Sequence, residues 1–201
     1  MSGLDYAVRE SRNETVRSLV RALESHGPGE GAHADRVAVY AAATGERLGI
    51  DGHDLIDLRW GAALHDVGKI SLDPALLRKL GKLTEDEMGQ MRMHAELAMR
   101  VIEEFEWLSA ALPMVKHHHE RFDGSGYPDG LAGDDIPLGA RIIGVAETFD
   151  VLTFSPGWRE PMSIEDALDE VRRCSGAQFD PQVVEAFCEV QPLIQPLGFV
   201  D

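Results

Sequence analysis

The sequence has little of several features that define large protein classes. It contains only two cysteines, Cys174 and Cys188, both late in the chain, which excludes a disulfide framework and a Cys-x-x-Cys zinc site. No apolar run approaches about eighteen residues, so no membrane span and no membrane partner are expected. The first residues, MSGLDYAVRE, lack the basic, apolar and small-residue order of a secretory signal. We therefore expect a cytoplasmic protein and interpret both cysteines as helix-packing residues.

Basic residues are also scarce. Lysine and arginine total 19 against 35 acidic residues, and the net charge is −16. A polymeric nucleic acid is an unsuitable partner, because phosphate backbones are bound through clustered cations. An anionic small molecule requires a local positive charge that overrides this field. Bound metal ions are one source of such charge.

What the chain does have is apolar residues at helical spacing, with 44% hydrophobic content. We expect helices over 13–25, 33–48 and 53–66, one capped at Thr84 that carries Met88, Met91 and His94, one from about Ser109 into the histidines at 117–119, one from Pro137, and two opened by Ser163 and Asp180–Pro181. Strand patterns are scarce. The interpretation is a single all-α domain over 1–201, with 1–12 as a flexible N-terminal segment.

The stretch HHHERFDGSGYP at 117–128 places three consecutive histidines before a glycine-rich loop. Long structured loops in compact domains are often functional. Further candidate metal ligands lie on different expected helices: His33, His65, Asp66, His94, His118, His119 and Glu147. Taken singly, each is more often a surface or core residue. Together they predict two metal ions that share a carboxylate, in a set that suits iron, manganese or zinc. His26 and His53 are interpreted as solvated.

Several segments resemble the HD-GYP family, the branch of the HD metal-dependent phosphohydrolase superfamily whose members hydrolyse cyclic di-GMP. They are LHDVGKI at 64–70, His94, HHHERFDGSGYP at 117–128 and GLAGDDIPLGARIIGVAETFD at 130–150. The resemblance covers the chain from about residue 13. It implies an HD-domain helical bundle with an extended GYP-type loop. Family members usually carry an appended receiver or sensor domain, for which we expect no room here.

The resemblance also implies roles for individual residues. His33, His65 and Asp66 match ligands of a first metal, and His94, His118 and His119 match ligands of a second, with Asp66 bridging and Glu147 at the last ligand position. Lys69 matches a lysine that contacts phosphate, and Gly126 and Tyr127 belong to the loop at the substrate pocket. His117 is assigned a structural role. Glu120 and Asp123 are expected to orient imidazole N–H groups.

The implied reaction is hydrolysis of cyclic di-GMP to pGpG, with or without a second cut to GMP. A hydroxide that bridges the two ions would attack phosphorus, and Lys69 would stabilise the developing charge. Asp66 and Lys69 are thus the expected catalytic residues.

The sequence departs from the family pattern at three places. Gly29 stands where members with a third metal have a glutamate, and Glu30 is one residue away, so we expect two ions. Glu147 replaces an aspartate. In the segment SPGWRE, Arg159 is retained as a substrate-binding candidate, whereas Pro156 replaces an arginine.

Two alternatives stay open. One is a phosphohydrolase for another cyclic dinucleotide, such as cyclic GMP-AMP. The other is a non-catalytic domain that senses the dinucleotide or binds a protein partner. A homodimer is equally compatible with the sequence.

Overall fold

In the computed structural model, the described residues are 3–79, 81–154 and 160–194. The helices are α1 (Gly3–His26), α2 (Glu30–Arg47), α3 (Gly52–Leu64), α4 (Pro74–Leu77), α5 (Glu85–Arg92), α6 (His94–Ile102), α7 (Leu112–Lys116), α8 (Leu138–Phe154), α9 (Ile164–Arg173) and α10 (Pro181–Val190). Four short 3₁₀ helices complete the set: η1 (Val67–Ser71), η2 (Glu106–Leu108), η3 (Gly133–Asp135) and η4 (Gln191–Leu193). The described residues form no strand apart from one isolated bridge, which confirms the all-α class.

Several helices begin where the sequence supplies a capping side chain. Thr84 accepts a hydrogen bond from the amide of Glu87, whose carboxylate accepts one from the amide of Thr84, so both partners of the capping box are present. Ser163 caps α9, and Asp180 caps α10 directly before a proline. These residues fix the helix starts through hydrogen bonds to amides only two or three residues away in the sequence.

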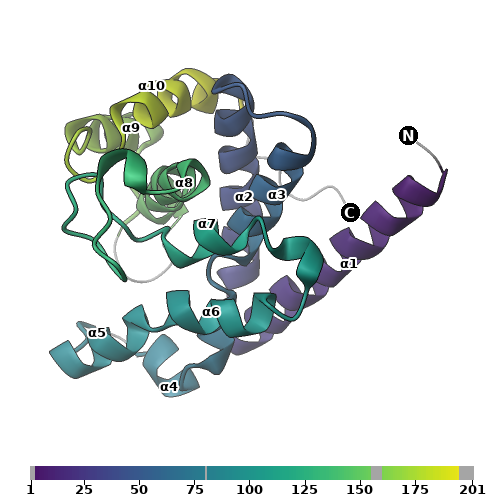
Figure 1. Ribbon diagram of the computed structural model, residues 1–201. Coiled ribbons are helices and arrows are strands. Elements are labelled where there is room, and N and C mark those ends of the chain that lie inside the picture. Colours follow the sequence, from purple (N-terminus) through teal and green to yellow (C-terminus); the bar gives the residue numbers. More distant parts are fainter. Residues whose placement is uncertain (1–2, 80, 155–159, 195–201) are drawn as a thin grey trace.

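The centre of the fold is formed by α2, which packs on α3, α8, α1 and α10 (Figure 1). Leu58 of α3, Phe149 of α8 and Phe187 of α10 are almost completely buried there. The α4–α5 arm and the first half of α1 project away from this centre in opposite directions (Figure 1). No helix among the described residues is long and apolar enough to cross a membrane.

Three local expectations differ from the structure. Helix α1 begins at Gly3 rather than at residue 13. The expected helix through His94 is divided, because α5 ends at Arg92 and His94 opens α6. The histidines at 117–119 lie in a turn after α7, not in a helix. The domain boundaries themselves stay a prediction.

Candidate metal centre

His65 and Asp66 are positioned by a close approach between two backbone segments. They follow α3 directly, and the chain then enters η1, which lies against the start of α6. A Cβ atom added to Gly68 would lie 1.9 Å from the carbonyl oxygen of His94. Only glycine allows this contact. The approach brings Asp66 beside His94, although 28 residues separate them in the chain.

The histidines and Asp66 form two groups whose potential ligand atoms lie within 4.8 Å of one another. The first group is His33, His65 and Asp66, and the second is His94, His118 and His119. The resemblance to the HD-GYP family implied this same division. Asp66 also reaches the second group, since its Oδ1 lies 3.2 Å from Nε2 of His94, while its Oδ2 lies 3.2 Å from Nε2 of His65. One carboxylate thus faces both groups.

Three of the imidazoles are oriented by backbone carbonyls. Nδ1 of His65, His94 and His118 lies 2.6–2.7 Å from the carbonyl oxygen of the residue three positions earlier. Nδ1 therefore donates, and in the neutral form of each imidazole Nε2 is left with its lone pair directed into the site. In His94 and His118 these Nε2 atoms lie 3.3 Å apart, which is a separation suited to sharing one ion.

His33 is oriented differently, by a carboxylate that sequence reasoning missed. Its Nδ1 lies 2.7 Å from Oδ2 of Asp150, and Asp150 in turn accepts two hydrogen bonds from Arg36. Asp150 lies three residues after Glu147 on α8, and Arg36 lies three residues after His33 on α2. Such spacing places each pair on one helix face, so it was an available signal.

Lys69 and Glu30 extend the network of charged side chains beyond Asp66. The ammonium group of Lys69 lies 2.7 Å from Oδ2 of Asp66 and 3.0 Å from Oε2 of Glu30. Burial alone would lower the pKa of Lys69, but the two carboxylates outweigh it and raise that pKa. Burial alone would raise the pKa of Asp66, but Lys69 and His65 outweigh it and hold that pKa well below its ordinary value. Asp66 is therefore an anion and Lys69 a cation.

The imidazoles of the two groups differ in their proton affinity. Burial lowers the pKa of His94 to about 4 despite the nearby Asp66. Burial and the neighbouring imidazoles also hold the pKa of His118 well below its usual value. For His65, burial alone would lower the pKa, but Asp66 outweighs it and raises it to about 9. His94 and His118 are thus neutral donors at physiological pH.

These residues fit divalent metal ions. Nε2 of His65 and Oδ1 of Asp66 are buried and accept no hydrogen bond within the described part of the chain. Buried polar atoms without partners are costly, unless an ion or water satisfies them. Imidazole nitrogen with one carboxylate is a donor set for iron, manganese or zinc. The arrangement is a candidate metal centre made of two adjoining groups.

The loop after the histidines is held by two carboxylates, which corrects one expectation. Oε1 of Glu120 accepts hydrogen bonds from the amides of Asp129 and Gly130, and Asp123 accepts from Ser125. Neither residue has a hydrogen bond to an imidazole among the described contacts. The prediction that Glu120 and Asp123 orient imidazole N–H groups is therefore wrong, since both carboxylates bind amides of their own loop. His117 lies 2.9 Å from Asp129, in agreement with its expected structural role.

Gly126 brings the loop back onto its own start. A Cβ atom there would lie 2.4 Å from the amide nitrogen of Arg121, so this position also requires glycine. The next residue, Tyr127, places its ring 4.9 Å from that of His119. The guanidinium carbon of Arg92, the last residue of α5, lies 5.2 Å from the Tyr127 ring centroid. Burial and the nearby Glu147 raise the pKa of the Tyr127 hydroxyl, which stays protonated.

The remaining predicted residues have mixed outcomes. Oε2 of Glu147 lies 3.9 Å from Nδ1 of His119, at the edge of the second group, so its role as a ligand stays a prediction. Pro156 and Arg159 lie outside the described residues. His53 is exposed, whereas His26 is half-buried and lies 3.0 Å from the carbonyl oxygen of Leu72, which contradicts the prediction of a solvated side chain.

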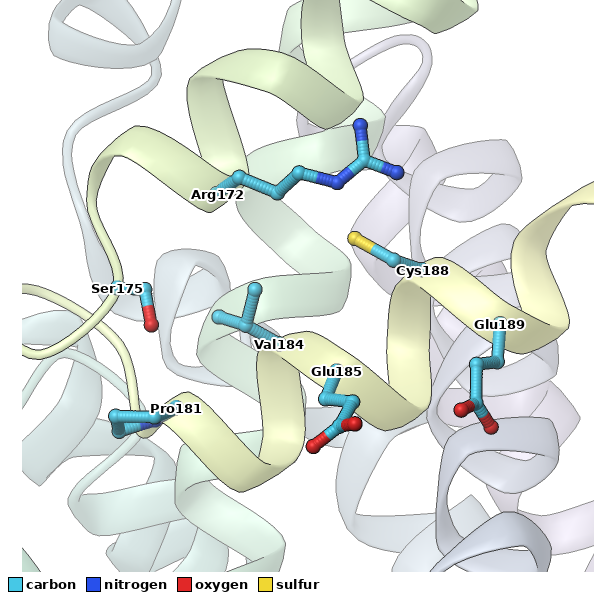
Figure 2. Close-up of a pocket in the computed structure, with 7 residues that line it drawn as sticks. All are labelled: Arg172, Ser175, Pro181, Val184, Glu185, Cys188 and Glu189. Carbon is cyan, nitrogen blue, oxygen red and sulfur yellow. The ribbon is translucent and has the colours of Figure 1, made fainter.

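Both cysteines pack partly against the core, as expected. Cys188 also lines an open pocket of about 430 Å³ between α9 and α10 (Figure 2). None of the residues that line this pocket belongs to the metal groups. The pocket is therefore separate from the candidate site.

Comparison with known proteins agrees with this geometry. The HD domain family model matches residues 17–183. The cyclic di-GMP phosphodiesterase response regulator RpfG of Xanthomonas campestris pv. campestris is 38% identical over 89% of this chain and 48% of its own length. The 3′3′-cGAMP-specific phosphodiesterase 2 of Vibrio cholerae is 33% identical over 90% of this chain and 35% of its own length. The chain thus spans about half or less of these curated relatives.

A solved structure has the same fold. The cyclic GMP-AMP-specific phosphodiesterase V-cGAP3 of V. cholerae superposes with a TM-score of 0.70 at 23% identity. The match covers 89% of this chain and 48% of that one. At this identity, the likeness establishes the helical architecture alone.

Proposed function

The chain belongs to the HD domain family, in its HD-GYP branch, and on that premise we propose that it is a metal-dependent phosphodiesterase that hydrolyses cyclic di-GMP. The observation that carries the proposal is Asp66, whose two oxygens face different groups of histidines. A shared carboxylate is the arrangement that a pair of ions requires. The curated relatives named above act on cyclic dinucleotides.

The proposed ligands are those of the two groups together with Glu147. When bound, a pair of divalent ions supplies Lewis acidity toward a phosphate oxygen and toward water. We propose iron or manganese, with zinc as the alternative, because imidazole and carboxylate suit all three. The positive charge of the ions would also offset the repulsion between the protein, whose net charge is −16, and its anionic substrate.

The residues of the chain then have separate tasks. Asp66 holds negative charge between the two groups, and backbone carbonyls keep the imidazoles in the required tautomer. Lys69, beside Asp66, is placed to interact with a phosphate. Tyr127 lies beside His119, and Arg92 lies over the Tyr127 ring, where its cation is placed to contact an anionic phosphate of the substrate. The proposed product is pGpG, and the proposed location is the cytoplasm.

The proposal is tested with metal-loaded protein purified without oxygen. Metal content per chain is measured first, and cyclic di-GMP, cyclic GMP-AMP and cyclic di-AMP are then offered separately, with products separated by chromatography. We expect two ions per chain and metal-dependent formation of pGpG. Preferred cleavage of cyclic GMP-AMP would identify the other phosphodiesterase activity. Tight dinucleotide binding without turnover in fully metallated protein would indicate the non-catalytic sensor.

Replacement of Lys69 by methionine should leave metal content intact and lower turnover. The change removes a cation beside Asp66, so it does not weaken the attraction of that carboxylate for metal ions. A charge-assisted hydrogen bond to phosphate contributes about 1.5–3 kcal/mol, which corresponds to a roughly ten- to hundredfold lower kcat. Metal analysis and steady-state kinetics are both required. Lys79→Met is the matched control, because Lys79 also pairs with a glutamate but lies outside the metal groups. Loss of metal or full activity in Lys69→Met would contradict the assignment.

Replacement of Arg92 by alanine should raise KM for cyclic di-GMP about tenfold with little change in kcat. Arg92 is exposed, lies over the Tyr127 ring and has no carboxylate partner within 4.0 Å among the described residues. Its charge is therefore free for an anionic ligand, and one such contact contributes about 1.5 kcal/mol. Arg100, an exposed arginine on α6, provides the control Arg100→Ala. An unchanged KM in Arg92→Ala would exclude Arg92 from substrate binding.

A further inference from the structure

Asp150, which is buried, forms an ion pair with the half-buried Arg36 directly behind His33. Only 1% of Asp150 is exposed, and its Oδ2 lies 2.7 Å from Nδ1 of His33. Arg36 donates from Nε to Oδ1 at 2.6 Å and from a terminal nitrogen to Oδ2 at 2.8 Å. The guanidinium carbon of Arg36 also lies 4.3 Å from the ring centroid of Phe154, the last residue of α8. The carboxylate therefore has one fixed orientation.

His33 differs in this respect from the other anchored ligands. Nδ1 of His65, His94 and His118 is held by a backbone carbonyl, which no side-chain substitution removes. Nδ1 of His33 is held by a side chain from another helix. Its Nε2 then faces Oδ2 of Asp66 at 3.8 Å. The orientation of this one ligand therefore depends on the packing of α2 against α8.

We propose that Asp150, fixed by Arg36, is a positioning residue that sets the metal affinity of the His33–His65–Asp66 group separately from the His94–His118–His119 group. Among the described residues, Asp150 makes no hydrogen bond to any histidine of the second group. A carboxylate that accepts the far N–H of a ligating imidazole fixes its tautomer and increases its basicity as a ligand. Loss of that partner should therefore weaken the binding of the ion in the first group and leave the binding of the other ion unchanged.

The inference rests on the proposed metal-dependent function, and its test uses metal binding rather than activity. The full chain is stripped with a chelator and titrated with Mn²⁺ or Zn²⁺ in buffers of defined free metal concentration, with bound metal measured per chain. Asp150→Asn keeps the shape and an acceptor oxygen but loses the charge. We expect two binding steps in the wild type. In Asp150→Asn, one step should shift to about ten- to a hundredfold higher metal concentration while the other is unchanged.

A matched control separates positioning from stability. Asp180 is also a buried carboxylate paired with an arginine, at 2.6 Å from Arg141, and it lies outside both metal groups. Asp180→Asn should lower thermal stability in chelator without changing either binding step. Arg36→Lys retains a cation but cannot reproduce the two-point contact, so it should shift the same step by less than Asp150→Asn does. It also provides the test if Asp150→Asn fails to fold.

The outcomes distinguish this inference from the proposed function. No metal bound by the wild type would overturn the proposed function itself. Two unshifted steps in Asp150→Asn and Arg36→Lys, with a normal wild type, would overturn only the role of Asp150. Equal weakening of both steps would overturn the selectivity for the first group. A selective shift that Asp180→Asn does not reproduce would establish it.

Discussion

Asp66→Asn should abolish binding of at least one metal ion and reduce turnover about a thousandfold or more. Asparagine retains one carbonyl oxygen but replaces the other oxygen with an NH₂ donor, which cannot serve as a ligand. Because Oδ1 of Asp66 faces His94 and Oδ2 faces His65, one of the two groups must lose its shared donor. Loss of Lewis acidity removes several kcal/mol of transition-state stabilisation, and about 4 kcal/mol corresponds to a thousandfold.

The measurements are bound metal per chain and kcat/KM for cyclic di-GMP on the same sample. Circular dichroism verifies that the helices are retained. The double variant Asp66→Asn/Lys69→Met removes one negative and one positive charge, so the net charge of the site is unchanged. It tests whether the loss of metal in Asp66→Asn is caused by the lysine left without its carboxylate partner. If Asp66→Asn binds two ions as the wild type does, then another carboxylate is the bridge. Glu147, at 3.9 Å from His119, is then the first to be tested.

Much of the fold and the ligand set could be predicted from the sequence for local reasons. Capping at Thr84, Ser163 and Asp180 depends on residues within one helical turn, and all three caps are present. The division of the histidines into two groups followed from the positions of the motifs, since each motif stands in a fixed relation to the end of the helix that carries it. The resemblance to the HD-GYP family supplied that relation, and helical spacing alone did not.

Several of the predictions that were wrong concern places where the backbone leaves the helix. Imidazole N–H groups near a helix end donate to carbonyls three residues earlier, which is compatible with the turn that contains His118. The sequence offers no strong breaker between Lys116 and the loop, so the end of α7 could not be located. The partners of Glu120 could not be predicted either, because the amides of Asp129 and Gly130 come within reach of its carboxylate only once the loop has formed.

Long-range pairs were missed for another reason. Asp150 and Arg36 are 114 residues apart, and Lys69 and Glu30 are 39 apart. Each of these residues looks like an ordinary charged position on a helix. Its partner is identified only by the packing of α2 against α8 and by the approach of Lys69 to Glu30 in the folded chain. Lys69 is the instructive case, since its motif position suggested a free cation for phosphate. The structure shows a lysine that already contacts two carboxylates, so its charge is partly neutralised before any phosphate binds.

Gly68→Ala should be the most damaging single-methyl substitution near the site. The added Cβ would lie 1.9 Å from the carbonyl oxygen of His94 and 2.5 Å from the amide nitrogen of Ala98. Both atoms belong to the backbone of α6, so no side-chain rotation relieves the clash, and η1 must separate from the helix. Overpacking of this kind costs about 1–3 kcal/mol or more. The displacement also moves Asp66, two residues earlier, away from His94.

The expected result is a melting temperature lower by several degrees, together with weaker metal binding, because about 1 kcal/mol shifts the melting temperature of a domain of this size by roughly 2–4 °C. Gly89→Ala is the matched control. Gly89 lies in α5, and a Cβ atom there would meet nothing within 4 Å. Alanine is the better helix former, so this variant should be neutral or slightly more stable. Differential scanning fluorimetry with and without chelator, followed by metal titration, separates the two effects. Unchanged stability and metal binding in Gly68→Ala would mean that the contact between η1 and α6 does not position Asp66. The position of Asp66 would then depend on the end of α3 alone.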